Sequence, residues 1–265
     1  MERDTRDGIL SVEILSSPKT STFEEAWYEL ALESHFWFQW RWLAFSRQMW
    51  DLKVPLNKEL KALEVGCGRG ILSGQVEAST RWNVDGADLS LSALSTGKRG
   101  RGRRLLYDVR EEKKEFLEAY DVLIVFDVLE HMRNTRGFLS SALRHLKGGG
   151  FFFIDVPAFQ VFHSPYDVVM GHLRRYSKKT LVKEFGGFSL KIVDLRYWGF
   201  SMVPLLAMRK ILLAGIQGRN QIVKSGFRPP QGLGHTLLRA MMRVETALFS
   251  SPPAGTSLLM VGIKC

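Results

Sequence analysis

The sequence predicts an α/β fold, a Rossmann-like, seven-stranded and mostly parallel sheet sandwiched by helices. Three observations predict it. Apolar runs of strand length alternate with helical patterns from residue 61 to residue 198. Two of these runs, Val122–Phe126 and Phe151–Ile154, are apolar throughout, as expected of central parallel strands buried on both faces. The first run leads into Leu63-Glu-Val-Gly-Cys-Gly-Arg-Gly70, a glycine-rich turn that can open a nucleotide-binding βαβ unit.

The elements follow in chain order. After a disordered start, residues 22 to 50 predict one or two helices that are very rich in aromatic side chains. These rings outnumber what one core-packing stripe needs, so some are expected to line a pocket. Helices are expected from Ile71 and over 178–186, the second opened by Ser177. Strands are expected near 61–66, 83–88, 103–108, 120–126, 149–155, 189–198 and 257–264.

We expect one structural domain in three parts. Residues 1–60 form an N-terminal tail and an aromatic helical cap, residues 61–198 with 255–265 form the Rossmann-like core, and residues 199–254 form a helical insertion. The insertion contains two apolar segments interrupted by arginine or lysine. They predict a lid packed on the core, which is compatible with an interfacial surface or a tunnel for a lipid-like molecule.

Composition bounds the compartment and the partners. The charged start predicts no signal peptide, no window of the sequence predicts a spanning helix, and two cysteines, Cys67 and Cys265, cannot build a disulfide framework. We expect a cytoplasmic protein with peripheral membrane contact through 199–249. The net charge of +10 would also suit nucleic acid, but the basic run Lys98–Arg104 has no interleaved aromatic residues. A solvated loop is favoured there, and no nucleic-acid partner is expected.

The glycine turn predicts a ligand site. Gly66, Gly68 and Gly70 lack a Cβ, so the backbone can turn sharply and approach a ligand closely. A helix that begins at Ile71 would offer its unpaired N–H groups to the turn. Asp88 lies about 20 residues beyond Gly66, where a carboxylate can accept both hydroxyls of a ribose. Asp88 could also cap the following helix, and the two roles are compatible.

The type of nucleotide follows from two departures. A dinucleotide-binding turn has the pattern G-x-G-x-x-G, and Ile71 occupies the position where its third glycine would stand. Glu64, near the strand end, would repel a pyrophosphate and attract the ammonium of an amino-acid group. A nucleoside with an amino-acid tail and no phosphate fits better, and S-adenosylmethionine is such a molecule.

Three segments resemble the successive signatures of class I S-adenosylmethionine-dependent methyltransferases: Glu64–Gly70, Gly86–Ser90 and Phe126–His131. The resemblance is closest to the small-molecule branch that includes the ubiquinone-biosynthesis O-methyltransferases. Three further segments resemble a largely uncharacterised bacterial subgroup: Ser34–Arg41, Gly171–Tyr176 and Gly255–Lys264.

The resemblance implies the class I methyltransferase fold and methyl transfer to a small molecule, an apolar or lipid-like O- or N-acceptor. It places Asp108 against the adenine amino group, unless Asp108 caps a helix over 111–118. It pairs Arg41 with the methionine carboxylate, unless Arg41 faces solvent. The expected S-adenosylmethionine-binding residues are Arg41, Glu64, Gly66, Cys67, Gly68, Gly70, Asp88, Leu89, Asp108, Val109, Phe126, Asp127 and Val128.

The residues after the fourth strand are candidates for chemistry. His131 titrates near neutrality and could accept a hydroxyl proton as a general base, or it packs beside the cofactor. Asp127, Glu130 and His131 can converge at i, i+3 and i+4. The ubiquinone-type enzymes hold a divalent cation with a glutamate-rich version of this segment. Aspartate replaces the first glutamate here, and no metal is expected.

The acceptor is the least specified part. His172, Arg175 and Tyr176 could recognise it or could pair structurally with carboxylates. The alternatives to a small-molecule methyltransferase are a nicotinamide-dependent Rossmann oxidoreductase, a methyltransferase of RNA or protein, and a binding protein that performs no transfer. The sequence leaves the oligomeric state open.

Overall fold

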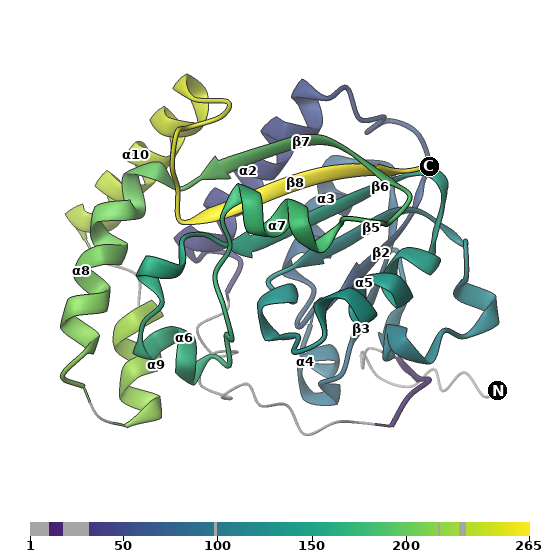
Figure 1. The fold of residues 1–265 in the computed structure, drawn as a ribbon, viewed down its shortest axis with the longest axis horizontal. Helices are drawn as coiled ribbons and strands as arrows, with labels where there is room; N and C mark the ends of the chain where they lie inside the picture. The colour runs from purple at the N-terminus through teal and green to yellow at the C-terminus, as the bar shows by residue number, and fades with distance from the viewer. Residues whose placement is uncertain (1–10, 18–31, 98–99, 217, 228–231) are drawn as a thin grey trace.

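The computed structural model describes residues 11–17, 32–97, 100–216, 218–227 and 232–265. Eight strands form one sheet in the order β1-β4-β3-β2-β5-β6-β8-β7 (Figure 1). All neighbours pair in parallel except β8, which runs antiparallel to both β6 and β7. The strands are β1 Val12–Ile14, β2 Lys61–Val65, β3 Asn83–Asp88, β4 Arg104–Leu106, β5 Tyr120–Phe126, β6 Leu146–Pro157, β7 Leu190–Trp198 and β8 Ser257–Lys264.

The seven expected strands are confirmed as β2 to β8. The sheet has one further short strand, β1, which was not expected. Val12–Ile14 lies in the stretch expected to be disordered and pairs in parallel with β4. Three residues are too few for a recognisable alternation, and this strand depends on backbone hydrogen bonds to an open sheet edge.

Helices cover both faces of the sheet. Leu123 and Val125 of β5 pack into one apolar core, and their neighbours Val122 and Ile124 pack into another. The first core includes side chains of α5 and α7, and the second includes side chains of α2, α3 and α10. The described helices are α2 Phe36–Asp51, α3 Ile71–Ser79, α4 Leu91–Ser95, α5 Thr135–Arg144, α6 Pro165–Val169, α7 Lys178–Glu184, α8 Val203–Leu213, α9 Arg219–Phe227 and α10 Leu233–Leu248.

The aromatic segment before the sheet divides its rings between core and pocket. Trp40 and Phe45 of α2 are fully buried, whereas Trp37 and Phe38 line the pocket described below. The expectation that some rings line a pocket is therefore confirmed. Residues 18–31, with Trp27 and Tyr28, lie outside the described residues.

The insertion forms the end wall on the left of Figure 1, built from α8, α9 and α10. Two helices were expected, and α9 is additional. Its sequence is largely polar, but Ile222 and Val223 pack with Tyr166 of α6 and Leu213 of α8 in a separate small core. Two apolar residues give no helical stripe, so only tertiary contacts reveal this helix. Within the described part of the chain, no helix is long and apolar enough to span a membrane.

The described part of the basic run before β4 is solvated only in part, because Arg101 is exposed whereas Arg104 is buried. Arg103 pairs with Asp85 at 2.6 Å, and Arg101 donates hydrogen bonds to the carbonyls of Thr80 and Trp82. The Arg104 side chain is buried beneath the glycine turn, beside Cys67 Sγ at 3.8 Å. All three arginines thus contact other parts of the chain, although Arg101 is exposed and Arg103 is partly exposed.

Candidate active site

A large pocket of about 1370 Å³ lies beyond the carboxyl ends of β2, β3, β4 and β5, the edge at which parallel α/β sheets bind ligands. The turns after these strands line one end, and α8 and α10 line the other. Pockets for a single small molecule span roughly 300–1,000 Å³. This volume leaves room for two ligands side by side.

The glycine turn shapes one end of the pocket. Gly66, Gly68 and Gly70 all have φ between 52° and 76°, a left-handed conformation that favours glycine. Gly66 lines the pocket, and a Cβ there would collide with Val128. Gly68 and Gly70 are absent from the lining. Gly70 leaves space for the Arg104 guanidinium, so these two glycines shape the turn behind the pocket surface.

Asp88 is held in place at the end of β3. Its Oδ2 accepts a hydrogen bond from the Gly68 N–H at 2.7 Å, and its Oδ1 accepts one from the Ser90 N–H at 2.8 Å. Ser90, and not Asp88, caps α4 by accepting from the Ala93 N–H. Each carboxylate oxygen keeps a further acceptor position, and Asp88 lines the pocket. Burial raises the pKa of its carboxyl.

Two other carboxylates line the same end. Glu64 is buried, accepts a hydrogen bond from the Ser73 hydroxyl, and has its pKa raised by burial. Asp108 caps the short turn Val109–Glu111 and pairs with Arg110 at 2.7 Å. The capping role considered for Asp108 is therefore present, although the turn starts two residues earlier than expected. Burial also raises the pKa of the Cys67 thiol well above its usual range, which keeps it uncharged.

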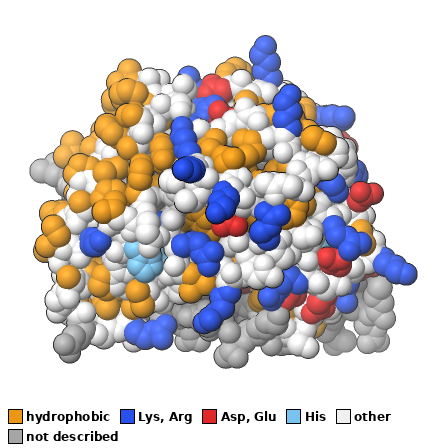
Figure 2. All heavy atoms as spheres, viewed as in Figure 1, with side chains coloured by type: hydrophobic (Ala, Val, Ile, Leu, Met, Phe, Trp, Pro, Cys, Tyr) orange, Lys and Arg blue, Asp and Glu red, His pale blue; other side chains and the backbone are white. Residues whose placement is uncertain are grey.

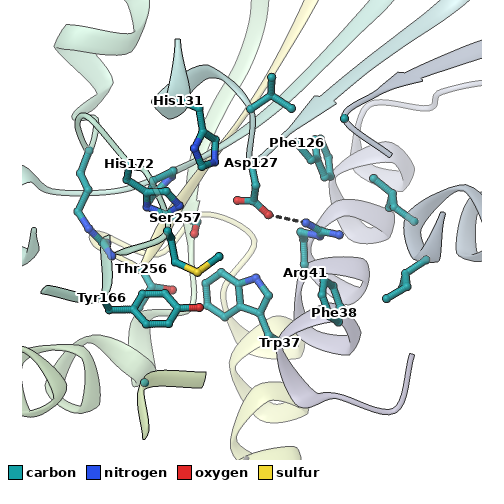
Figure 3. A pocket seen from close by; sticks show the side chains of 18 of the residues that line it. Trp37, Phe38, Arg41, Phe126, Asp127, His131, Tyr166, His172, Thr256 and Ser257 are labelled. Atoms are coloured by element: carbon teal, nitrogen blue, oxygen red, sulfur yellow. Dashed lines mark hydrogen bonds and ion pairs between the residues drawn. The ribbon is translucent and has the colours of Figure 1, made fainter. Parts of the chain in front are cut away.

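Arg41 and Asp127 form an ion pair across the middle of the pocket, joined at 2.6 Å (Figure 3). The Arg41 guanidinium lies between the rings of Phe38 and Phe126, 5.2 and 5.5 Å from their centroids. Its Nε is buried without a hydrogen-bond partner among the described residues. Arg41 therefore faces the pocket, not solvent, and the guanidinium keeps a donor for a second acceptor.

A histidine pair lies on the other side of Asp127 (Figure 3). The rings of His131 and His172 meet edge to face, with centroids 4.8 Å apart. The His131 Nδ1 donates to the Gly171 carbonyl at 3.2 Å, and the His172 Nδ1 donates to Asp167 Oδ1 at 3.0 Å. Because these partners only accept, each ring keeps its lone pair on Nε2. Burial, with the charge of His172, lowers the pKa of His131 to about 3.

Behind the pair lies a buried carboxyl. Glu130 is fully buried, and neither of its oxygens has a hydrogen-bond partner on another described residue. Burial and the neighbouring charge of Asp127 raise its pKa well above the usual range. One donor atom each of Glu130, His131 and His172 lies within 4.8 Å of the others, a set able to hold a divalent ion such as zinc. The converging trio thus contains His172 in place of the expected Asp127, which pairs with Arg41.

Asp167 orients the His172 side of the site. Although burial opposes it, the hydrogen bond from His172 and the charge of Arg175 hold the pKa of this carboxyl well below its usual range. Arg175 Nε donates to it at 2.8 Å, which is the structural pairing considered for this arginine. Tyr176 is almost fully buried, donates to the Leu129 carbonyl and does not line the pocket, so the proposed recognition role of Tyr176 is wrong.

The remaining lining is mostly apolar. Leu89, Val109, Phe126 and Val128 line the glycine-turn end, as expected of cofactor-binding residues. The other end combines residues that sequence reasoning did not assign to the site: Trp37, Tyr166, Met202, Leu205, Leu206, Met208, Leu212, Leu213, Leu237, Leu238, Met241, Thr256 and Ser257. The aromatic cap and the apolar insertion indicated this end in the sequence, but not which of their residues line it.

Comparisons with known proteins identify the core. Residues 63–152 match the family model described as a methyltransferase domain. This stretch includes the glycine turn, Asp88, Asp108 and His131, which lies in the turn after β5. This part of the chain, about a third of its length, is therefore similar to methyltransferase domains.

The curated relatives match only part of the chain. The ubiquinone biosynthesis O-methyltransferase of Rhizobium etli is 28% identical over 109 residues, which cover 39% of this chain and 44% of the relative. The mitochondrial enzyme of the same name from Candida albicans is 32% identical over 107 residues, or 37% and 33% of the two chains. The chain thus spans less than half the length of these curated relatives.

The solved structures show the fold. The geranyl diphosphate C-methyltransferase of Streptomyces coelicolor, solved with Mg²⁺, geranyl diphosphate and S-adenosyl-L-homocysteine, superposes with a TM-score of 0.52 at 13% identity, covering 83% of this chain and 80% of its own. The [4+2]-cyclase SpnF superposes with a TM-score of 0.55 at 14% identity, covering 83% and 80%. The chain therefore has the class I methyltransferase fold, which also hosts other chemistry.

Proposed function

We propose that the protein transfers a methyl group from S-adenosylmethionine to a small, apolar-bodied molecule. One observation carries the proposal: a single pocket joins a polar end at the glycine turn to an apolar end at α8 and α10. Methyl transfer is an in-line displacement in which the enzyme positions donor and acceptor and excludes water. A continuous pocket with room for both molecules meets that requirement.

The polar end fits the donor. Asp88 would accept hydrogen bonds from the ribose hydroxyls through the acceptor positions that Gly68 and Ser90 leave available. Leu89, Val109 and Val128 would pack against the adenine, with Asp108 near its amino group. Glu64 would attract the ammonium of the methionine part, and Arg41 would bind its carboxylate through the donor not used by Asp127.

The apolar end supports an O- or N-acceptor with a hydrophobic body. His131 was expected as the general base, but its lowered pKa leaves it weakly basic. We infer that His172 is the base. Its Nδ1 is held by ionised Asp167, its ring lines the pocket, and its Nε2 keeps a lone pair. An adjacent carboxylate both fixes the tautomer and stabilises the imidazolium that forms on proton transfer.

Calorimetry on the full chain tests the donor. We expect S-adenosylmethionine and its demethylated product to bind and NADH not to bind. Binding of NADH alone would favour the oxidoreductase alternative. Incubation with methyl-labelled donor and separate lipid, RNA and protein fractions then tests the acceptor class. Label in RNA or protein would contradict a small-molecule acceptor, and donor binding without any transfer would favour a binding protein. A cytoplasmic location stays a prediction.

A further inference from the structure

The helices α8 and α10 expose apolar side chains in addition to those that they bury. Leu206 and Leu213 of α8 face inward, as do Leu238 and Met242 of α10. The opposite sides carry large apolar residues in water, with Ile211 exposed to 75% and Leu248 to 71%. We call this set the lid face: Leu205, Met208, Ile211, Leu212, Leu237, Val244, Leu248 and Phe249.

Figure 2 shows hydrophobic side chains gathered on the left of the molecule, where Figure 1 places α8 and α10. A contiguous exposed apolar patch on a soluble chain marks an interaction site. The spacing of Leu205, Met208 and Leu212 on α8, and of Leu237, Val244 and Leu248 on α10, keeps each set on one side of its helix. Both helices are thus apolar on an inner and on an outer face.

The charge of this region selects the partner. Its only acidic residue, Glu245, is buried and accepts hydrogen bonds from the N–H groups of Phe200 and Ser201. The sequence of residues 199–254 holds seven basic residues against it: Arg209, Lys210, Arg219, Lys224, Arg228, Arg239 and Arg243. Arg209 is directed inward, over the ring of Tyr166, whereas Arg243 of α10 is exposed and lies next to the exposed Val244. Two copies of such a face would repel each other. An exposed apolar surface in a segment with an excess of basic residues fits the surface of an anionic bilayer, which attracts each nearby Lys or Arg by about 1 kcal/mol.

Part of the lid face also lines the pocket. Leu205, Met208, Leu212 and Leu237 are exposed on the outside and line the pocket on the inside. A molecule that leaves a bilayer at this face could enter the pocket between α8 and α10 along an apolar path.

We propose that the lid face binds the surface of anionic membranes, and that the methyl acceptor is a lipid that enters from there. The binding stands on the exposed face alone, whereas the lipid acceptor rests on the proposed methyl transfer. The two parts are tested separately.

Co-sedimentation of the full chain with vesicles tests the binding without any methyl donor. We expect binding to vesicles of phosphatidylcholine with about 30% phosphatidylglycerol, weaker binding to phosphatidylcholine alone, and a decrease with added salt. Ile211→Ser with Leu248→Ser should weaken it by about 100-fold, because each buried aliphatic side chain contributes on the order of tenfold. Arg243→Ala should weaken it about fivefold. None of these three residues lines the pocket.

The matched control is Ile14→Ser, since Ile14 is 65% exposed on β1, at the opposite edge of the sheet. It should leave vesicle binding unchanged. Equal binding to anionic and neutral vesicles, or no loss in the double variant, would overturn the proposal. The proposal would also be overturned if light scattering showed a dimer of the wild type and a monomer of the double variant, because a second copy would then cover the lid face. Donor binding by calorimetry is independent of all these outcomes, so failure at the membrane and failure of methyl transfer are distinguishable.

If the acceptor is a lipid, label from the methyl donor should appear in the organic phase when vesicles of extracted membrane lipid are supplied. The double variant should lower this transfer from vesicles but not from a detergent-dispersed extract. If the wild type and the double variant each transferred label equally well from vesicles and from the detergent-dispersed extract, entry through the lid face would be contradicted.

Discussion

The two ends of the pocket are built on opposite principles. At the glycine-turn end, Asp88, Asp108 and Asp127 are each held by a backbone N–H or an arginine. At the lid end, Leu205, Met208 and other apolar side chains line the wall and remain partly in water. Fixed polar groups can recognise one ligand with defined hydrogen bonds, whereas an apolar wall binds according to bulk and burial.

The difference teaches where each kind of substitution should act. Removing one held polar group leaves its partners unsatisfied and has a large, specific effect. Removing one exposed apolar group changes little within the folded chain, because that group is already in water. The following substitutions test this contrast, from the largest expected effect to the smallest.

Substitution of the proposed base should have the largest effect. His172→Gln keeps a side chain of similar reach but cannot accept a proton, so turnover should fall by roughly 10²–10⁴-fold. Donor affinity, measured by calorimetry, should change little because the ring is not needed there. If only His131→Gln lowers turnover in this way, the base is His131, as the sequence predicts. If either variant loses donor binding with normal residual turnover, that histidine is structural.

Loss of the carboxylate at the end of β3 should weaken the donor. Asp88→Ala should reduce S-adenosylmethionine affinity by about 1–3 kcal/mol, or roughly 5- to 150-fold, because charged hydrogen bonds to the ribose are lost. Glu59→Ala is the matched control, since Glu59 is an exposed carboxylate that pairs with Arg81 and does not line the pocket. Unchanged affinity in Asp88→Ala would remove the ribose assignment.

The buried carboxyl behind the histidines should show in the pH dependence of stability. The pKa of Glu130 is raised in the folded protein, so folding binds a proton above pH 4.5, and the wild-type stability falls as pH rises toward the folded pKa. Glu130→Gln removes the titrating carboxyl. As pH rises through that range, the free energy of unfolding of the variant should therefore increase relative to that of the wild type, by up to about 1.4 kcal/mol per pH unit. Urea unfolding at several pH values, with a chelator present, measures this. Parallel pH curves would contradict it.

The smallest effect belongs to the lid face. Ile211→Ser should change the free energy of unfolding by no more than about 0.5 kcal/mol, because the side chain is already mostly exposed. Leu206→Ala on the inner side of the same helix should cost about 2–5 kcal/mol. Urea unfolding compares the two. A large loss in Ile211→Ser would mean that the outer face is packed in the folded chain, against the contrast drawn here.

Much of the glycine-turn end could be predicted from sequence, because each of its elements is local. Gly66, Asp88, Asp108 and Asp127 each follow a strand whose apolar pattern is readable, and parallel strands bring their carboxyl ends to one edge. The solvated basic loop is only partly confirmed: Arg101 is exposed, but Arg103 and Arg104 find partners at Asp85 and Cys67, which no local pattern reveals.

By itself, the sequence determined the class of fold, the seven main strands and the polar end of the pocket, since periodicity and strand–turn motifs encode these locally. Only the tertiary structure decided the rest. It placed His172 beside Glu130 and His131, because the Leu173 N–H bonds to the Glu130 carbonyl at 2.9 Å and joins two loops distant in the chain. It also decided which side of α8 and α10 faces the core and which faces water. Two apolar sides look alike in a sequence, and only packing against α2 and α6 distinguishes them.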